Sequence, residues 1–166
     1  MQETIQVSFS ALPAADVPKE YFKDSNRALF HMFADVPTTF EALNPPNEEL
    51  IDNRRVMVMH APSQMIFEVP PGATELHGAF GFVTGAYTGE GRTNGAQFII
   101  HWQDGQRSTI LLERFLEPLT KLNDRGLQKF AVRLPQGTGR VYLEVKPGPF
   151  NEFAFDWTAW TGIEFK

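Results

Sequence analysis

The 166-residue chain contains no cysteine, so disulfide bonds, thiolate catalysis and the common zinc-finger ligand sets are excluded. Its fold must therefore depend on a hydrophobic core, and a chain of this length can bury roughly two-thirds of its unfolded surface. Hydrophobic residues make up 42% of the sequence and include 15 Phe, which can supply such a core. We expect a domain that folds without a disulfide or a metal.

Concentrated positive charge is also missing. The net charge is −5 and the Lys and Arg residues are scattered, so we expect no binding to nucleic acid. No apolar run approaches the roughly 20 residues that span a bilayer, and no basic amphipathic helix is indicated, so no membrane insertion is expected. The N-terminus lacks the pattern of a secretion signal. This favours a cytosolic domain or a piece of a longer chain, and a piece would favour an extracytoplasmic or cell-envelope location.

Long helical patterns are absent, and short runs in which hydrophobic and other residues alternate take their place. Period-two alternation is typical of strands buried on one face. The runs are Ile5, Val7 and Phe9; Met65, Phe67 and Val69; Leu76, Phe80 and Phe82; Phe98, Ile100 and Trp102; Phe130, Val132 and Leu134; Val141, Leu143 and Val145; Phe153, Phe155 and Trp157; and Ile163 and Phe165. Separated by Gly and Pro, they predict an all-β fold, an antiparallel β-sandwich of jelly-roll type, as a single domain over residues 1–166.

Local signals add detail to this fold. Asp104-Gly105 lies between two strand patterns and predicts a hairpin, and Gln136-Gly137-Thr138-Gly139 predicts another. Residues 11–53 are interpreted as an irregular segment packed on the sandwich. Within it, short helices are expected over residues 24–33 and in a turn that Asn47 caps.

Three segments carry a resemblance to a known family. They are His60-Ala61-Pro62-Ser63 with the strand that follows, the strand of residues 97–102 with its Asp-Gly turn, and Asp156-Trp157-Thr158-Ala159-Trp160. In this order, over residues 55–166, they resemble the "novel putative carbohydrate-binding module" family, a galactose-binding-like β-sandwich. The resemblance implies a non-catalytic domain that recognises glycans through its edge loops. It also implies that a structural calcium ion can be present, although no ligand is assigned to one.

A second resemblance points to a larger protein. Residues 123–128, residues 137–143 and Pro147-Gly148-Pro149 are similar to soluble β-domains attached to bacterial membrane glycosyltransferases. This implies that the chain is an accessory part of a cell-envelope glycan enzyme. The alternative function is therefore a structural or protein-interaction domain with a larger parent or partner enzyme.

The segment of residues 156–160 contains the most specific candidate residues. An exposed ring of Trp157 or Trp160 could stack on the apolar face of a sugar, while Asp156 accepts hydrogen bonds from hydroxyl groups. The alternative interpretation is that both Trp rings fill the core and Asp156 caps a local turn.

The glycine-rich loop of residues 84–95 is the second candidate. Loops on a rigid scaffold often carry binding groups. Here Tyr87 could stack on a sugar, and Arg92 and Asn94 could recognise hydroxyl groups; the alternative is a mobile, solvated hairpin loop. His101 alternates with Ile100 and Trp102, so it is expected to face a groove or solvent.

No motif for catalysis is found. The four His residues show no local metal-ligand spacing, no pair of carboxylates is marked for glycoside hydrolysis, and no serine lies in a nucleophile elbow. We therefore expect no enzymatic activity and no cofactor, and a glycan hydrolase is the weakest alternative.

Overall fold

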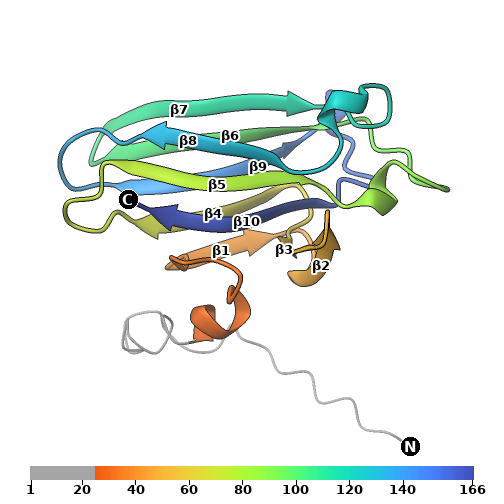
Figure 1. Cartoon of the computed structure of the whole chain (residues 1–166). Coiled ribbons are helices and arrows are strands. Elements are labelled where there is room, and N and C mark those ends of the chain that lie inside the picture. The colour runs from red at the N-terminus through yellow and green to blue at the C-terminus, as the bar shows by residue number, and fades with distance from the viewer. Residues whose placement is uncertain (1–24) are drawn as a thin grey trace, which may run out of the picture.

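The computed structural model describes residues 25–166, which form two five-stranded antiparallel sheets packed face to face (Figure 1). Sheet A contains, in spatial order, β1 (Thr39–Ala42), β4 (Ser63–Glu68), β9 (Arg140–Pro147), β6 (Ala96–Asp104) and β7 (Arg107–Leu116). Sheet B contains β2 (Asn47–Ile51), β3 (Arg54–Val58), β10 (Thr158–Phe165), β5 (Glu75–Phe82) and β8 (Gln128–Arg133). The predicted antiparallel β-sandwich is confirmed.

Most connections cross from one sheet to the other. Among the described strands, only β2–β3 and β6–β7 are neighbours both in the chain and in a sheet. The hairpin predicted at Asp104-Gly105 is confirmed, because β6 pairs with β7 and Gly105 adopts a φ of 47°. The hairpin predicted at residues 136–139 is wrong, since β8 pairs with β5 whereas β9 pairs with β4 and β6. β8 and β9 belong to different sheets and bury their apolar sides from opposite layers, so the turn between them crosses the sandwich.

The core lies between the sheets and is rich in aromatic rings. The Phe80 and Phe98 rings stack with centroids 4.5 Å apart, and Trp160 contacts them at 5.4 and 5.5 Å. Residues that alternation placed inside and that are buried include Met65, Phe67, Leu76, Phe82, Ile100, Trp102, Phe130, Leu134, Val141, Leu143, Val145 and Ile163. Contacts between such large flat rings stabilise both layers at once.

The segment expected to be irregular contains two strands. Within its described part, β1 and β2 form, and the helical turn predicted after Asn47 is wrong because Asn47–Ile51 pairs with β3. Asp52 and Asn53, both at positive φ (50° and 61°), form the tight turn that makes this hairpin. The expected helix over residues 24–33 is shorter, since residues 25–29 are helical and a turn follows. The predicted strand around Val7 lies outside the described residues.

The strand predicted from Phe153 to Trp157 is also wrong. Residues 148–157 form a loop, and β10 begins at Thr158. Phe150, Asn151 and Phe155 have positive φ angles of 62°, 56° and 62°, which are incompatible with a strand. The alternating Phe residues therefore belong to a loop and do not form the buried face of a strand.

Several long connections gather at one end of the sandwich, on the right in Figure 1. They include the β5–β6 loop (residues 83–95), the β7–β8 loop (residues 117–127) and the β9–β10 loop (residues 148–157). The residues that the structure describes contain no helix long and apolar enough to cross a membrane. The two candidate segments from the sequence, residues 84–95 and 156–160, thus meet at this loop end.

Candidate functional site

The β5–β6 and β9–β10 loops pack against each other without space for a side chain between them. A Cβ atom on Gly148 would lie 2.4 Å from the Gly95 carbonyl oxygen, so glycine is required for this approach. Asn94 joins the loops, because its Nδ2 donates to the Pro149 carbonyl at 3.1 Å and to Glu152 Oε2 at 3.3 Å. Asn94 therefore positions the β9–β10 loop.

The β5–β6 loop is folded on itself. It starts with a 3-10 turn over Thr84–Ala86, and the Thr93 N–H donates to the Ala86 carbonyl at 3.1 Å. A Cβ on Gly91 would lie 2.1 Å from the Gly85 carbonyl oxygen, so the chain closes tightly there. The glycine-rich sequence thus produces a packed loop with its own hydrogen bonds rather than a loosely solvated hairpin.

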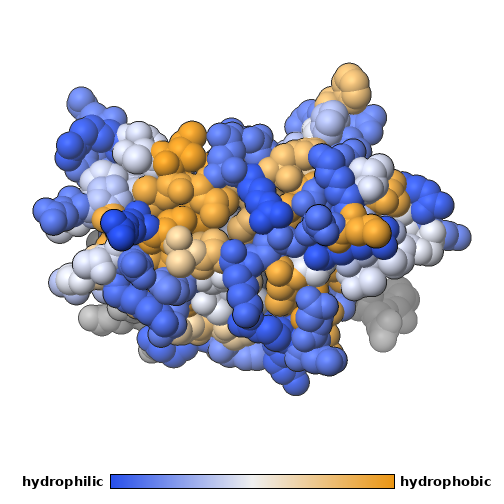
Figure 2. Space-filling view, turned by 45° about the horizontal axis from the view of Figure 1, so that its top comes forward, coloured by the Kyte–Doolittle hydropathy of each residue, from blue (hydrophilic) through white to orange (hydrophobic). Residues whose placement is uncertain are grey.

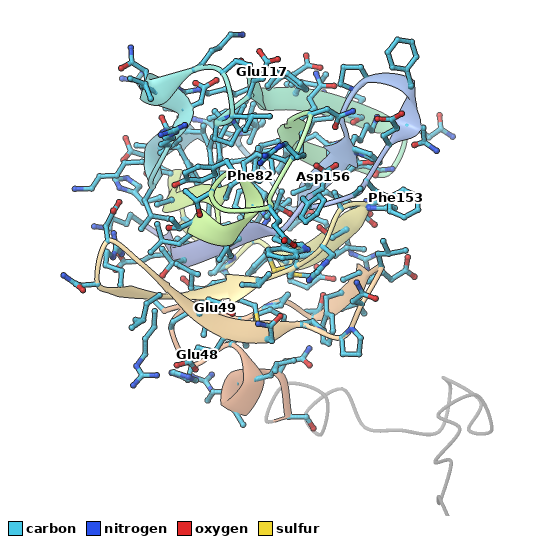
Figure 3. The ribbon with its side chains drawn as sticks, turned by 90° about the vertical axis from the view of Figure 1, so that its right-hand side faces the viewer. Glu48, Glu49, Phe82, Glu117, Phe153 and Asp156 are labelled. Atoms are coloured by element: carbon cyan, nitrogen blue, oxygen red, sulfur yellow. The ribbon has the colours of Figure 1, made fainter. Side chains whose placement is uncertain are left out.

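Asp156 is buried beneath the two loops, with an exposed fraction of 0%. The Thr93 hydroxyl donates to its Oδ1 at 2.6 Å, whereas Oδ2 has no hydrogen-bond partner of normal geometry among residues 25–166. Burial raises the pKa of Asp156 to about 6, and the Thr93 hydroxyl and the nearby Gly148 N–H counteract this only in part. The carboxylate thus ties the loops together from inside, and Figure 3 shows it near the centre of the loop end.

Two of the aromatic residues predicted to stack on sugars are packed. Trp160 is 1% exposed and lies in the core, which corresponds to the core-filling interpretation of the sequence. Tyr87 is 9% exposed, and the Arg125 guanidinium lies 5.0 Å from the centre of its ring. The Tyr87 ring therefore joins the β5–β6 loop to the β7–β8 loop instead of presenting an open face.

Trp157 is half-buried at the loop end. A Cβ on Gly85 would lie 3.1 Å from its ring, so the indole packs over the backbone of the β5–β6 loop. Its ring centre lies 5.6 Å from that of Phe155 and 6.2 Å from that of His60. Burial lowers the pKa of His60, which favours the neutral imidazole beside the indole. These rings form an aromatic cluster that is partly open to solvent.

Exposed aromatic residues on the β9–β10 loop were missed by the sequence interpretation. Phe150 is 93% exposed at a φ of 62°, and Phe153 is 48% exposed. Figure 3 shows Phe153 at the margin of the loop end, pointing away from the body. The Pro147-Gly148-Pro149 sequence marked the loop, but the alternation of Phe153 and Phe155 suggested a strand. Residues held in sparsely populated backbone regions cluster at functional sites, so this loop is a candidate for one.

Arg92 is exposed near the tip of the β5–β6 loop. Its Nη1 donates to the carbonyl oxygens of Gly89 and Gly91 at 3.0 and 2.7 Å, which orders the guanidinium at the surface. Guanidinium has five N–H donors in a fixed plane, so a side chain held in this way can also donate to another acceptor.

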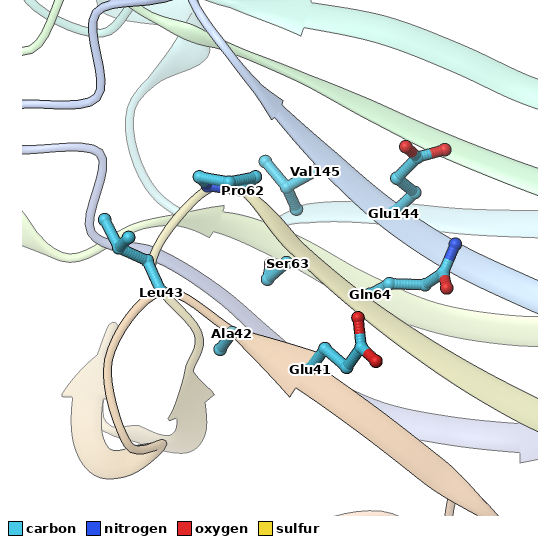
Figure 4. A pocket seen from close by; sticks show the side chains of 8 residues that line it. All are labelled: Glu41, Ala42, Leu43, Pro62, Ser63, Gln64, Glu144 and Val145. Carbon is cyan, nitrogen blue, oxygen red and sulfur yellow. The ribbon is translucent and has the colours of Figure 1, made fainter.

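His101 lies away from these loops, on the outer face of sheet A. Its ring is 4.7 Å from that of Tyr142 in an edge-to-face arrangement, and its Nε2 is buried without a hydrogen-bond partner in the described chain. Burial lowers the pKa of His101. On the same face, a groove of about 350 Å³ crosses β1, β4 and β9, where Glu41, Gln64 and Glu144 stand side by side (Figure 4).

No metal centre is defined in the described chain. Residues 25–166 contain no group of three or more His, Asp or Glu side chains arranged to hold an ion. Ca²⁺ takes six to eight oxygen ligands, so we assign no calcium ligand set.

The two-sheet sandwich is a fold that carbohydrate-binding modules also adopt. No family model matches the sequence, and no curated protein matches it either. Solved structures do match in fold. One is the CBM51 module of GH95 from Clostridium perfringens in complex with methyl-galactose, with a TM-score of 0.58, 9% identity and coverage of 78% of this chain and 94% of that chain.

A second similar structure comes from the same organism. It contains the CBM51-2 and INT domains of ZmpB from Clostridium perfringens, with a TM-score of 0.55 and 12% identity over 76% of this chain. The present chain spans only 29% of that structure's length. At such low identity the similarity shows a shared fold, and it confirms that the fold resembles that of a carbohydrate-binding module.

Proposed function

We propose that this chain is a non-catalytic carbohydrate-binding module that recognises glycans with the loops at one end of its sandwich. The observation that carries the proposal is the aromatic β9–β10 loop. Phe150 and Phe153 expose their rings to solvent, Trp157 is partly open, and Asn94 and Asp156 hold the loop in place. Exposed rings on an ordered loop offer the flat apolar surface on which the apolar face of a sugar stacks. The similar fold of the CBM51 modules supports this assignment.

The predicted site residues take different roles in this proposal. Phe150, Phe153 and Trp157 contact the sugar rings, and Arg92 donates hydrogen bonds to hydroxyl groups. Asn94, Asp156 and Tyr87 are positioning residues, because Asn94 Nδ2, Asp156 Oδ1 and the Tyr87 ring each contact a neighbouring loop. His101 and Trp160 lie outside this site, on the outer face of sheet A and in the core.

The proposal that the domain is not catalytic rests on how its carboxyl groups are placed. Glycoside hydrolysis needs two carboxyl groups roughly 5–10 Å apart in an open cleft, one of them with a raised pKa. In the described chain, the carboxyl group with a raised pKa is Asp156, which is fully buried beneath the loops. It cannot reach a glycosidic oxygen without opening of the loops.

The proposal is tested by a broad glycan array, followed by calorimetric titration. Methyl-galactoside and N-acetylglucosamine are the first probes, because similar modules carry these sugars. We expect a dissociation constant between micromolar and millimolar for at least one glycan, and weakening of about tenfold or more in Phe153→Ala. Ile110→Ala is the matched control, since Ile110 is an exposed apolar residue (59%) on sheet A. An array without any hit, or equal binding by both variants, would contradict the proposal.

A second candidate function is a structural or protein-interaction domain of a larger cell-envelope glycan enzyme. Leu122, 71% exposed on the β7–β8 loop, favours a protein contact next to the segment that resembles glycosyltransferase β-domains. If this function holds, a pulldown should recover a partner or parent enzyme, and Leu122→Asp should abolish its recovery. Sugars should then leave the melting temperature unchanged. Such a domain would lie outside the cytoplasm or in the envelope.

A further inference from the structure

The outer face of sheet B contains a hollow of about 430 Å³ that shares no lining residue with the β9–β10 loop. Its floor is made by Gly78, Phe130, Ala131 and Gly162, from β5, β8 and β10. Figure 2 views the molecule obliquely from the side of β5 and β8, and shows hydrophobic and hydrophilic residues interspersed over this side. A hollow of this size is within the range of small-ligand sites.

A bulge in β10 lies at the edge of the hollow. The register between β10 and β5 shifts between Thr161 and Glu164, and Gly162 in the bulge has a φ of 63°. A Cβ on Gly162 would lie 3.0 Å from Arg54 Nη2, so the missing side chain lets the Arg54 guanidinium lie beside the bulge. Bulges often direct a side chain toward a site. Arg54 of β3 thus lies at the rim of the hollow.

The rim has a surplus of positive charge. Arg54 and Lys129 both line the hollow, and neither forms an ion pair within the described chain. The neighbouring carboxylates are already used: Glu75 Oε2 lies 2.7 Å from His77 Nε2, and Glu164 lies 3.3 Å from Lys166 Nζ. The rim can therefore attract an anionic group.

We propose that this hollow is a second binding site that takes an acidic sugar residue, whose carboxylate is attracted by Arg54 and Lys129. Arginine binds carboxylates through parallel hydrogen bonds, and lysine adds a point charge. Gly78, Ala131 and Gly162 leave space for a sugar ring beside the two cations, while the Phe130 ring packs into the core against Phe80 and Trp160. The positive charge of the rim is the reason for proposing an acidic ligand. That this ligand is a sugar rests on the proposed function.

The site is tested by titrating the full chain with trigalacturonate, using the neutral galactose trimer and inorganic phosphate as comparison probes. Arg54→Gln and Lys129→Gln should each weaken trigalacturonate binding at least about fivefold. Arg107→Gln is the matched control, because it removes the same charge from an exposed side chain paired with Asp104 in the β6–β7 hairpin. It should change the affinity less than about twofold. All three side chains are exposed, so melting temperatures should stay close to that of the unmodified chain.

Each contrary outcome overturns a defined part of the proposal. Equal losses in Arg54→Gln and Arg107→Gln would indicate general charge attraction and remove the site. Competition by phosphate as strong as by trigalacturonate would remove the sugar component. Loss of trigalacturonate binding in Phe153→Ala, but not in Arg54→Gln, would place the ligand at the loop end. If the neutral trimer and all array glycans fail while trigalacturonate binding still depends on Arg54, the second site stands and the proposed loop-end function fails.

Discussion

Replacing Asp156 with asparagine should change how the stability of the domain depends on pH. Asp156 is fully buried, and its pKa is raised from 3.8 to about 6 by burial. An acid with a raised pKa in the folded state favours folding when it is protonated. Its contribution is therefore fully present below about pH 3.8 and is lost as the pH rises through about 6. A difference of about two pKa units corresponds to about 3 kcal/mol as an upper value. The asparagine side chain would keep an acceptor for the Thr93 hydroxyl and carry no charge.

Urea unfolding of both proteins between about pH 4 and 7.5 measures this effect. Glu48 and Glu75 have lowered pKa values because of hydrogen bonds to His31 and His77, and they act in the opposite direction. The difference between the two proteins cancels these shared contributions. We expect the unfolding free energy of the Asp156→Asn variant, relative to the unmodified chain, to rise by about 1–3 kcal/mol from the lower to the higher pH. Parallel curves over this range would refute the burial of a chargeable Asp156.

Three further substitutions test the packing and the loop. Trp160→Ala should destabilise the domain by about 3–5 kcal/mol in urea unfolding, because the buried indole contacts Phe80 and Phe98; a loss below about 1 kcal/mol would contradict its place in the core. Gly81→Ala should cost about 1–3 kcal/mol by the same measurement, since its Cβ would lie 2.5 Å from the Gly126 carbonyl oxygen, and unchanged stability would contradict this contact. Phe150→Gly should leave stability unchanged or raise it by about 1 kcal/mol, because the left-handed backbone favours glycine, while glycan affinity falls; a clear loss of stability would show that Phe150 is packed.

Strands with one buried face were predictable from the sequence. Val141, Leu143 and Val145 alternate because one side of β9 meets the core and the other does not. The strand β2 gave no such signal, since four of its five residues are exposed at the edge of sheet B. Pairing partners were not encoded locally either, so the connection at residues 136–139 was interpreted as a hairpin although it joins different sheets.

The sequence indicated the loops on which several candidate residues lie, but not the contacts that each residue makes. The sequence directed attention to Tyr87, Asn94 and Asp156, which do lie on the loops at one end. Their roles depend on how one loop packs against another, for example the contact of Arg125 with Tyr87 between two loops far apart in the sequence. Such contacts follow from the assembled sandwich and leave no local pattern. The exposure of Phe150 could not be inferred for the same reason.

The most direct test of glycan recognition by the loop end is a two-dimensional NMR titration of the ¹⁵N-labelled chain with a neutral glycan from the array. The account predicts that amide shifts concentrate in the β5–β6 and β9–β10 loops, around Arg92 and Phe153, and stay small on the outer faces of both sheets. Saturable shifts confined to a sheet face, with the amides of these two loops unmoved, would contradict it.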